Sequence, residues 1–251
     1  MPLYPPAGAS DAIASPLDIP GCALWLDASQ LALADNDPVA TWPDLSGNGY
    51  DATQATAENR PTFKAGIQNG LGIVRAVGAP DAQALGLSAA GLDLVRDLAA
   101  VTVAFAASGT ADSHVVIEAL DPAGIATRMR AEISTNVLGR LSATDSDSAY
   151  VLAEQNISDV AGRFVVALSV LDPIAMVATI EVASANPSVM TNVNPVSQRT
   201  PDSASLEVRI MGDAINSFAG DLGELIVWQR ALNARERRRV LEYLSAKWGT
   251  L

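Results

Sequence analysis

Cysteine and histidine are nearly absent from this chain: each occurs once, as Cys22 and His114. A single cysteine cannot form an intrachain disulfide, and one histidine with one cysteine is too few ligands for a zinc site. A Ser-His-Asp triad would have to use His114, and no nucleophile-elbow motif accompanies it. Cys22 lies in an apolar run, which predicts a buried small side chain rather than a catalytic thiol.

Basic residues and long apolar runs are also scarce. With 16 Lys and Arg against 28 Asp and Glu, the net charge is −12, which disfavours nucleic acid and anionic membranes as partners. No Lys or Arg precedes Arg60, and no apolar stretch is long enough for a membrane span or a signal peptide. We therefore expect a chain that is made in the cytoplasm and carries no secretion signal.

Aromatic residues make up only 5% of the chain, although apolar residues make up 49% and charged residues 18%. This composition argues against disorder and supplies a large core, built mainly from alanine and valine. The four Trp and four Phe are therefore expected to anchor that core. A shortage of aromatics also argues against a general polysaccharide binder that stacks sugars on exposed rings.

The first twenty residues differ from the rest of the chain. Five prolines interrupt them, and no periodic pattern is visible, which predicts an extended arm over residues 1–20 and a single domain over 21–251. The arm carries apolar side chains that a neighbouring surface could bury, so we expect it to bind a partner. The candidate contact residues there are Leu3, Tyr4, Ile13 and Leu17.

From residue 21 onward, short apolar runs alternate with turn signals, and little helical periodicity appears. Many strands with few helices predict an all-β fold, a two-sheet antiparallel sandwich. Residues 88–97 are the exception, where a helical turn is expected. The expected strands are 22–27, 39–42, 71–77, 101–107, 114–120, 127–133, 149–153, 163–171, 175–183, 205–211 and 222–228.

A helix is predicted at the end of the chain, over residues 233–248. Asn233 and Glu236 have the spacing of a capping box, and Gly249 is a typical helix stop. Several apolar residues at helical spacing would face the sandwich. The helix also carries the one basic patch, which is expected to pair with the acidic body, and Arg235 and Arg238 are its candidates for contact with a partner.

Two loops are rich in polar residues. In the segment 42–51, Asp44, Asn48 and Asp51 form an oxygen-rich cluster that suits either tight turns or a weak calcium site. The second loop, residues 184–203, is longer than an ordinary connection, and loops of that length are often functional. The candidate ligand-binding residues in and near such loops are Tyr50, Tyr150, Asn192 and Asn194.

Three segments, residues 23–31, 42–52 and 218–249, resemble concanavalin A-like (laminin G-like) jelly-roll domains. Such domains occur in phage virion proteins and bacterial surface proteins. The resemblance implies a jelly-roll sandwich with a C-terminal helix. Its Trp, Asp and Gly motifs are structural in that family, and the fold hosts lectins, glycosidases, adhesion modules and virion parts.

Glycosidases of similar fold carry paired carboxylates on one strand, in a Glu-x-Asp-x-x-Glu pattern, and no such run is present. Glu224 lies three positions after Asp221, and an odd offset predicts that the two side chains face opposite sides of a strand. Glu118 and Asp121 have the same spacing, and Glu132 and Glu181 stand without a second carboxylate two residues away. We therefore expect no enzyme, no catalytic residue and no cofactor other than calcium.

The leading hypothesis is a non-enzymatic decoration or attachment protein of a phage or phage-like virion, which docks to a capsid or tail protein or forms a homo-oligomer. It depends on the resemblance, the missing export signal and the proline-rich arm. The alternative is a carbohydrate-binding module that recognises a glycan on a host surface. A divergent glycoside hydrolase is a third hypothesis.

Overall fold

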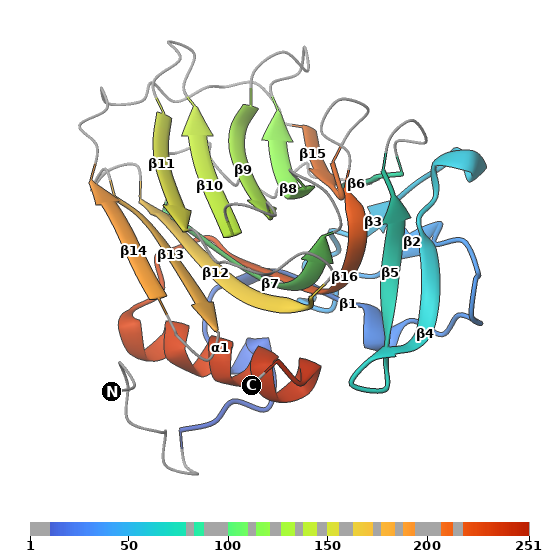
Figure 1. Ribbon diagram of the computed structural model, residues 1–251, viewed down its shortest axis with the longest axis horizontal. Helices are drawn as coiled ribbons and strands as arrows, with labels where there is room; N and C mark the ends of the chain where they lie inside the picture. The colour runs from blue at the N-terminus through green and yellow to red at the C-terminus, as the bar shows by residue number, and fades with distance from the viewer. Residues whose placement is uncertain are drawn as a thin grey trace.

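The protein is an all-β sandwich with one C-terminal α-helix, as predicted (Figure 1). The computed structural model describes residues 11–78, 83–87, 100–109, 114–120, 127–133, 138–144, 150–155, 163–172, 177–183, 188–193, 207–212 and 218–250. In these residues the strands form two antiparallel sheets, which we call the lower and the upper sheet after their places in Figure 1.

The lower sheet carries the long central strand β16 (Ala219–Trp228), which pairs with β7 along one side. On its other side, β16 pairs first with β5 and then with β1 (Cys22–Asp27). The remaining strands of the lower sheet, in spatial order, are β14 (Ser188–Val193), β13 (Val177–Ala183), β12 (Val165–Asp172), β7 (Val101–Gly109), then beyond β16, β5 (Leu71–Val77) and β4 (Thr62–Gln68).

The upper sheet is built from shorter strands. Antiparallel pairing joins each strand to the next across the whole sheet. In spatial order they are β11 (Tyr150–Gln155), β10 (Leu138–Thr144), β9 (Thr127–Ile133), β8 (His114–Leu120), β15 (Glu207–Ile210), β6 (Leu85–Leu87), β3 (Ala52–Thr53) and β2 (Thr41–Trp42).

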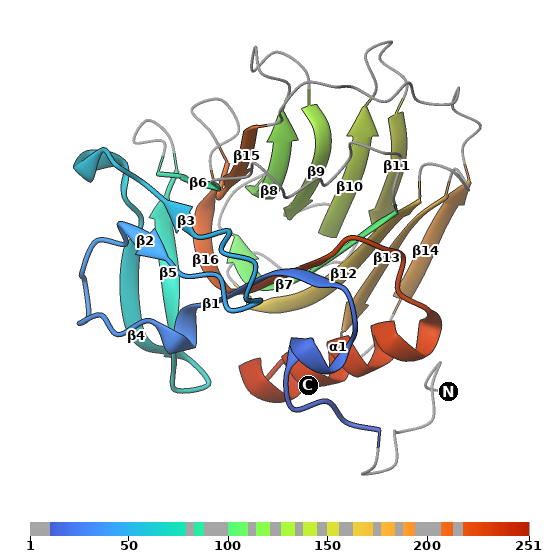
Figure 2. The same cartoon turned by 180° about the vertical axis from the view of Figure 1, so that it is seen from behind.

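Two apolar cores hold the layers together. The inner core lies between the two sheets and contains Trp42 and Phe105, both fully buried. The outer core lies between the lower sheet and helix α1 (Ala234–Trp248), with Trp228 and Trp248 fully buried in it. Figures 1 and 2 show α1 on the side of the lower sheet that faces away from the upper sheet. The helix thus closes that side of the sandwich.

Helix α1 begins and ends as the sequence predicts. The side chains and backbones of Asn233 and Glu236 bond reciprocally in a capping box, and Gly249 ends the helix in the left-handed conformation at φ 64°. Beyond it, the β4–β5 hairpin supplies further caps: Gln68 donates to the carbonyl of Trp248 at 2.6 Å, and Asn69 donates to that of Lys247 at 2.9 Å. No helix among the described residues is both long and apolar enough to cross a membrane.

Several expectations about the strands need correction. The predicted loop 184–203 contains a strand, β14, which pairs with β13 along its whole length. Strands β4 and β10 were not predicted, because Gly66 and Gly139 interrupt runs that lack a clear alternation of apolar and polar residues. The helical turn expected at 88–97 lies outside the described residues.

Residues 11–20 are not a free arm. They lie against helix α1 and the end of β16, as Figures 1 and 2 show, with Ile13 and Ile19 buried in the outer core. A short 3₁₀ turn, η1 (Pro16–Asp18), shapes the segment, which we call the N-terminal strap. The proline spacing predicts an irregular backbone here, as observed in residues 11–20. It does not indicate the contacts of this segment with β16 and α1, which lie more than 200 positions away in the sequence. The remaining short turns are η2 (Ala28–Gln30) and η3 (Ala57–Asn59).

Candidate functional site

The oxygen-rich loop 42–51 is a network of internal hydrogen bonds. One carboxylate oxygen of Asp44 accepts from the backbone N–H groups of Trp25 and Ser46, at 3.0 and 2.9 Å. Its other oxygen accepts from the Ser46 hydroxyl at 2.7 Å and from the backbone N–H of Tyr50 at 3.1 Å. Asp51 accepts from the backbone N–H of Asp44 at 2.8 Å. Asp44 therefore holds the loop onto strand β1.

These residues do not fit a calcium ion. Donor hydrogens already point at both oxygens of Asp44, and a cation cannot share those positions. Asn48 donates its amide to the carbonyl of Ala23 at 2.9 Å, so it also bonds within the loop. Among the residues that the structure describes, no three His, Cys, Asp or Glu side chains are grouped so that they could hold a metal.

Replacing Asp44 with alanine is expected to lower stability by roughly 0.5–2 kcal/mol, by analogy with the loss of a side-chain cap. Added calcium is expected to leave the melting temperature of the wild type unchanged. Thermal melts of both proteins, with calcium and with a chelator, test this. A mutant that melts like the wild type, or a calcium-dependent rise in the wild-type melting temperature, would contradict the structural role of this loop.

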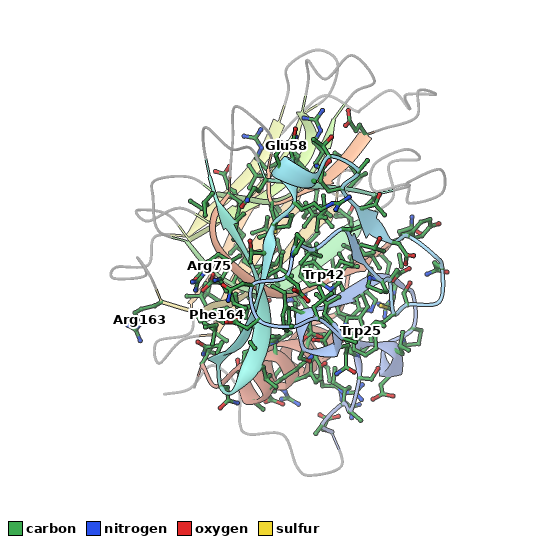
Figure 3. The ribbon with its side chains drawn as sticks, turned by 90° about the vertical axis from the view of Figure 1, so that its right-hand side faces the viewer. Trp25, Trp42, Glu58, Arg75, Arg163 and Phe164 are labelled. Atoms are coloured by element: carbon green, nitrogen blue, oxygen red, sulfur yellow. The ribbon has the colours of Figure 1, made fainter. Side chains whose placement is uncertain are left out.

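A second polar group, the Glu224 cluster, lies beneath the helix and comprises Glu224, Asp27, Lys247, Tyr243, Trp25 and Trp248. One Glu224 oxygen accepts from the indole N–H of Trp25 at 2.7 Å and from the Tyr243 hydroxyl at 3.0 Å. Its other oxygen accepts from Lys247 at 2.8 Å and from the indole N–H of Trp248 at 2.9 Å. Lys247 also donates to Asp27, at 2.5 Å. Figure 3 labels Trp25, which reaches this cluster from β1, and Trp42, which lies in the inner core.

The electrostatics of this cluster follow from its burial. Glu224 is fully buried, and desolvation raises its pKa, although the nearby charge of Lys247 opposes the shift. When the pKa of a carboxyl is higher in the folded than in the unfolded chain, its protonation adds to the free energy of unfolding. This contribution is complete at a pH below the unfolded-state pKa, and it is lost as the pH rises through the folded-state pKa. Four donors satisfy both oxygens of Glu224, so we interpret the cluster as the anchor of helix α1 and not as a reactive site.

The sequence predicted wrongly that Asp221 and Glu224 face opposite sides of their strand. The register of β16 against β7 shifts between Leu222 and Glu224, which marks a β-bulge. Leu222 and Leu225 consequently both enter the inner core, although three positions separate them. Asp221 and Glu224 therefore share the helix-side face, where Asp221 pairs with Arg75 in two bonds of 2.6 and 2.8 Å.

The glycine at the bulge, Gly223, has a packing reason. A Cβ atom on Gly223 would lie 2.7 Å from the ring of Trp248 and 2.8 Å from that of Phe164, so only glycine fits there. These two rings stack at a centroid distance of 5.4 Å. Close contact between the helix and the strand thus requires the glycine, and neither carboxylate has the free geometry of a glycosidase pair.

A third group lies on the outer face of the upper sheet. Glu118 on β8 and Glu132 on β9 both approach Arg130, with N–O distances of 3.0 and 3.8 Å. We call these three residues the Arg130 cluster. Ile117, Ala119 and Ala131 alternate with them and enter the inner core, so the cluster faces away from the core. The side chains of Glu118, Glu132 and Arg130 are nevertheless only 0%, 3% and 18% exposed.

Strand β15 extends this charged surface. Arg209 lies directly opposite Glu118 in the sheet register, and its guanidinium bonds to Glu207 at 2.9 and 3.0 Å. Arg209, Glu118 and Arg130 thus form a row across three adjacent strands. A spacing rule for two carboxylates on one strand cannot detect a pair on neighbouring strands. The alternation of Arg130 and Glu132 with apolar residues was the one available signal.

Buried charges on an outer sheet face are unusual, since desolvation is costly and a polar side chain there would ordinarily face water. Departures of this kind from local rules are expected mainly at functional or strained sites. The strands hold the charged groups rigidly, as recognition of a ligand requires. The Arg130 cluster is therefore the candidate functional site.

Those residues predicted to bind partners or ligands that the structure describes do not gather at one site. Ile13 is buried in the outer core, whereas Leu17 is 49% exposed. Arg235 and Arg238 pair with Asp11 of the strap. Tyr50 is half-buried against the inner core. Tyr150 begins β11 and Asn192 lies on β14, but their side chains, like Leu3, Tyr4 and Asn194, lie outside what the structure describes.

Cys22 is half-buried, and burial, with a smaller contribution from the charge of Asp44, raises the pKa of its thiol to about 12. A thiol with so high a pKa is protonated at neutral pH and is a poor nucleophile. The charge state of Cys22 thus agrees with the structural role that the sequence indicates.

The fold has clear counterparts among solved structures, although no family model and no curated protein matches the chain. The binding domain of botulinum neurotoxin DC in complex with SialylT is similar over 90% of this chain and 52% of its own, at 9% identity and a TM-score of 0.53. An arabinofuranosidase complexed with arabinofuranosyl-α-1,2-xylobiose is similar over 84% and 51%, at 17% identity and 0.57. Trypanosoma rangeli sialidase is similar over 90% and 33%, at 13% identity and 0.51.

These likenesses show the fold alone, a β-sandwich that is consistent with the predicted jelly roll. The chain spans about half of the first two proteins and a third of the sialidase, so the likeness does not assign their activities to this chain. Glycan-binding and glycan-cleaving proteins share the sandwich, and the prediction that this chain is not an enzyme is therefore not confirmed. None of these structures supports the predicted virion role, which stays a prediction.

Proposed function

We propose that this protein is a carbohydrate-binding module and that the outer face of the upper sheet, centred on the Arg130 cluster, binds the glycan. The observation that carries the proposal is the burial of Glu118 and Glu132 beside Arg130 on a sheet face turned away from the core. The fold supports it, because similar sandwiches occur in proteins whose structures contain glycans. Recognition of a glycan on a cell surface is the corresponding biological role.

The chemistry of the face suits sugar hydroxyls. Each hydroxyl donates one hydrogen bond and accepts others, and carboxylates accept while guanidinium groups donate. Arg209 and Arg130 are partly exposed and offer donors to a sugar, and Glu207 offers an acceptor. Glu118 is fully buried between the two arginines on neighbouring strands, where it accepts from Arg130 and holds that guanidinium in place. Hydrogen bonds to ionised groups are about twice as strong as neutral ones, so a few of them can fix a sugar ring.

The opposite side of the molecule is less suited to a ligand. Helix α1 and the N-terminal strap cover the outer face of the lower sheet, and Trp228 and Trp248 are fully buried beneath them. The rings of Trp228 and Trp248 are therefore not available to stack on sugars. Recognition on the upper sheet depends on polar contacts, in agreement with the low aromatic content.

The net charge of the chain favours neutral glycans. Among the side chains of this face that the structure describes, Glu118, Glu132 and Glu207 supply three carboxylates, and Arg130 and Arg209 supply two guanidinium groups. The whole chain adds a net charge of −12. An anionic sugar such as a sialic acid would meet repulsion at such a surface. We therefore expect neutral sugars to bind better than sialylated ones.

A glycan array that holds matched neutral and sialylated structures tests the proposal. The wild type is expected to bind neutral glycans, and Arg209→Ala is expected to bind them roughly tenfold more weakly, since a charge-assisted hydrogen bond contributes about 1.5–3 kcal/mol. Arg209 is 29% exposed and pairs with a half-exposed Glu207, so its loss should leave the fold intact.

The carboxylates are tested in the same way with Glu118→Gln and Glu132→Gln, compared at equal folded fraction as judged by thermal melts. Glu58→Gln is the matched control, because Glu58 is exposed on η3. No binding by the wild type to any glycan, or unchanged binding by all three variants, would overturn the proposed site. Release of sugar from a polysaccharide panel that Glu118→Gln abolishes would instead favour a hydrolase.

A further inference from the structure

The N-terminal strap, residues 11–20, is a pre-shaped segment that packs against α1 and the end of β16. We call the surface that it covers the groove; the residues that bond to the strap there are Trp228, Arg230, Arg235, Arg238 and Arg239. Asp18 accepts from the backbone N–H groups of Ala14 and Ser15, at 2.8 and 3.1 Å, and Ser15 accepts from that of Leu17 at 3.0 Å. These bonds lie within the strap. Its turn therefore does not depend on the groove for its shape.

The groove has one basic end and one apolar end. At the basic end, Asp11 accepts from Arg235 at 2.5 Å and from Arg238 at 2.7 Å, and the carbonyl of Asp11 accepts from Arg239 at 2.7 Å. In this acidic chain, three arginines meet one aspartate. Charge complementarity thus sets the position of the strap.

At the apolar end, Ile19 is 1% exposed and Ile13 is 8% exposed in the outer core. The buried indole N–H of Trp228 donates to the carbonyl of Ile19 at 3.2 Å, and Arg230 donates to the carbonyl of Pro20 at 2.8 Å. An empty groove would leave the Trp228 donor without a partner and expose apolar side chains. The groove therefore requires an occupant.

Only a short joint ties the strap to the sandwich. Pro20 and Gly21 form it, directly before β1, and Gly21 has a φ of +87°, which glycine adopts without strain. Because glycine can adopt other backbone conformations equally well, the joint can open without a steric penalty. The contacts described above join the strap to α1, to β16 and to Arg230, which lies between them. The strap of another molecule can make the same contacts.

We propose that this groove is a docking site for the strap of a second copy of the same chain, so that two molecules exchange straps. A reciprocal exchange reproduces every strap contact and closes a twofold dimer, which makes it a low-cost route to self-association. The surface salt bridges of Asp11 weaken with salt, so this end of the strap opens first. The inference is independent of glycan binding.

Reciprocal charge reversal tests the exchange with full-length chains. One chain carries Asp11→Arg, and the other carries Arg235→Glu with Arg238→Glu. Alone, each chain places like charges together and is expected to be monomeric with a loosened strap. Mixed in equal amounts, they are expected to form a 1:1 dimer, since each strap then matches the groove of the other chain. Light scattering coupled to size exclusion, or native mass spectrometry, measures the mass and composition.

A third chain that carries all three substitutions is the control, because it restores the charge match within one molecule. It is expected to melt like the wild type, which also shows that the substitutions are compatible with folding. A mixture that stays as two monomers overturns the proposal. Dimers of the Asp11→Arg chain alone, or of the chain with Arg235→Glu and Arg238→Glu alone, also overturn it, since association would then not depend on the strap.

Discussion

A chain that ends before Asn233 is expected not to fold. The truncation removes Val240, Leu244 and Trp248, all fully buried in the outer core. Loss of each large buried side chain costs roughly 2–5 kcal/mol, whereas a whole domain is stable by only about 5–15 kcal/mol. It also strips Glu224 of Lys247, Tyr243 and the Trp248 indole, which leaves a buried carboxylate with few partners.

Circular dichroism and thermal melts of the truncated chain check this expectation. Glu242→Ala is the control within the same helix, because Glu242 is 37% exposed and only approaches Arg238 at 3.8 Å. The control should melt like the wild type. A truncated chain with a cooperative transition near the wild-type melting temperature would show that the helix is an accessory and not part of the core.

Glu224→Ala is expected to destabilise the protein by about 3–5 kcal/mol, the usual cost when one partner of a buried ion pair is removed. The substitution leaves Lys247 with Asp27 as its remaining carboxylate partner. It also removes the acceptor to which Trp25, Tyr243 and Trp248 donate. Chemical denaturation of the mutant and the wild type measures the difference in the free energy of unfolding.

Glu58→Ala is the matched control for this change, since it deletes the same carboxylate at an exposed position. We expect it to alter stability by less than about 0.5 kcal/mol. If Glu224→Ala lost activity or ligand binding without any loss of stability, the Glu224 cluster would be a functional site, and its interpretation as a helix anchor would be wrong.

Local sequence patterns predicted a structural feature where all the residues that determine it lie in one short segment. The capping box of Asn233 and Glu236 and the stop at Gly249 are of this kind, and the structure confirms both. The Asp44 turn is similar, since most of its bonds lie within ten residues. Such features depend on neighbours in the sequence, which a single chain displays directly.

Features that depend on distant partners could not be predicted in this way. Glu224 lies in an apolar strand, and its indole partner Trp25 is 199 residues away in the sequence. The bulge at Gly223 places Asp221 and Glu224 on one face, and the ring of Trp248 that excludes a side chain at Gly223 belongs to helix α1. Proline spacing likewise predicted an extended arm and could not reveal the groove that the strap occupies.

The Arg130 cluster shows the same limit at the candidate site. Glu118 and Glu132 belong to different strands, so no spacing rule for one strand could pair them. Their separation in the sequence is modest, but the β8–β9 register is irregular between Val115 and Ile117. A shift of one residue in that register would have turned one of the carboxylates toward the core.

The most direct test of the central claim is a crystal structure of the protein with a glycan that binds it on the array. We predict that the sugar lies on the outer face of the upper sheet, with hydroxyls in hydrogen-bond contact with Glu207, Arg130 or Arg209. A sugar found on the loop 42–51, on the helix side or at the strap groove, with the Arg130 cluster free of ligand, would contradict the account.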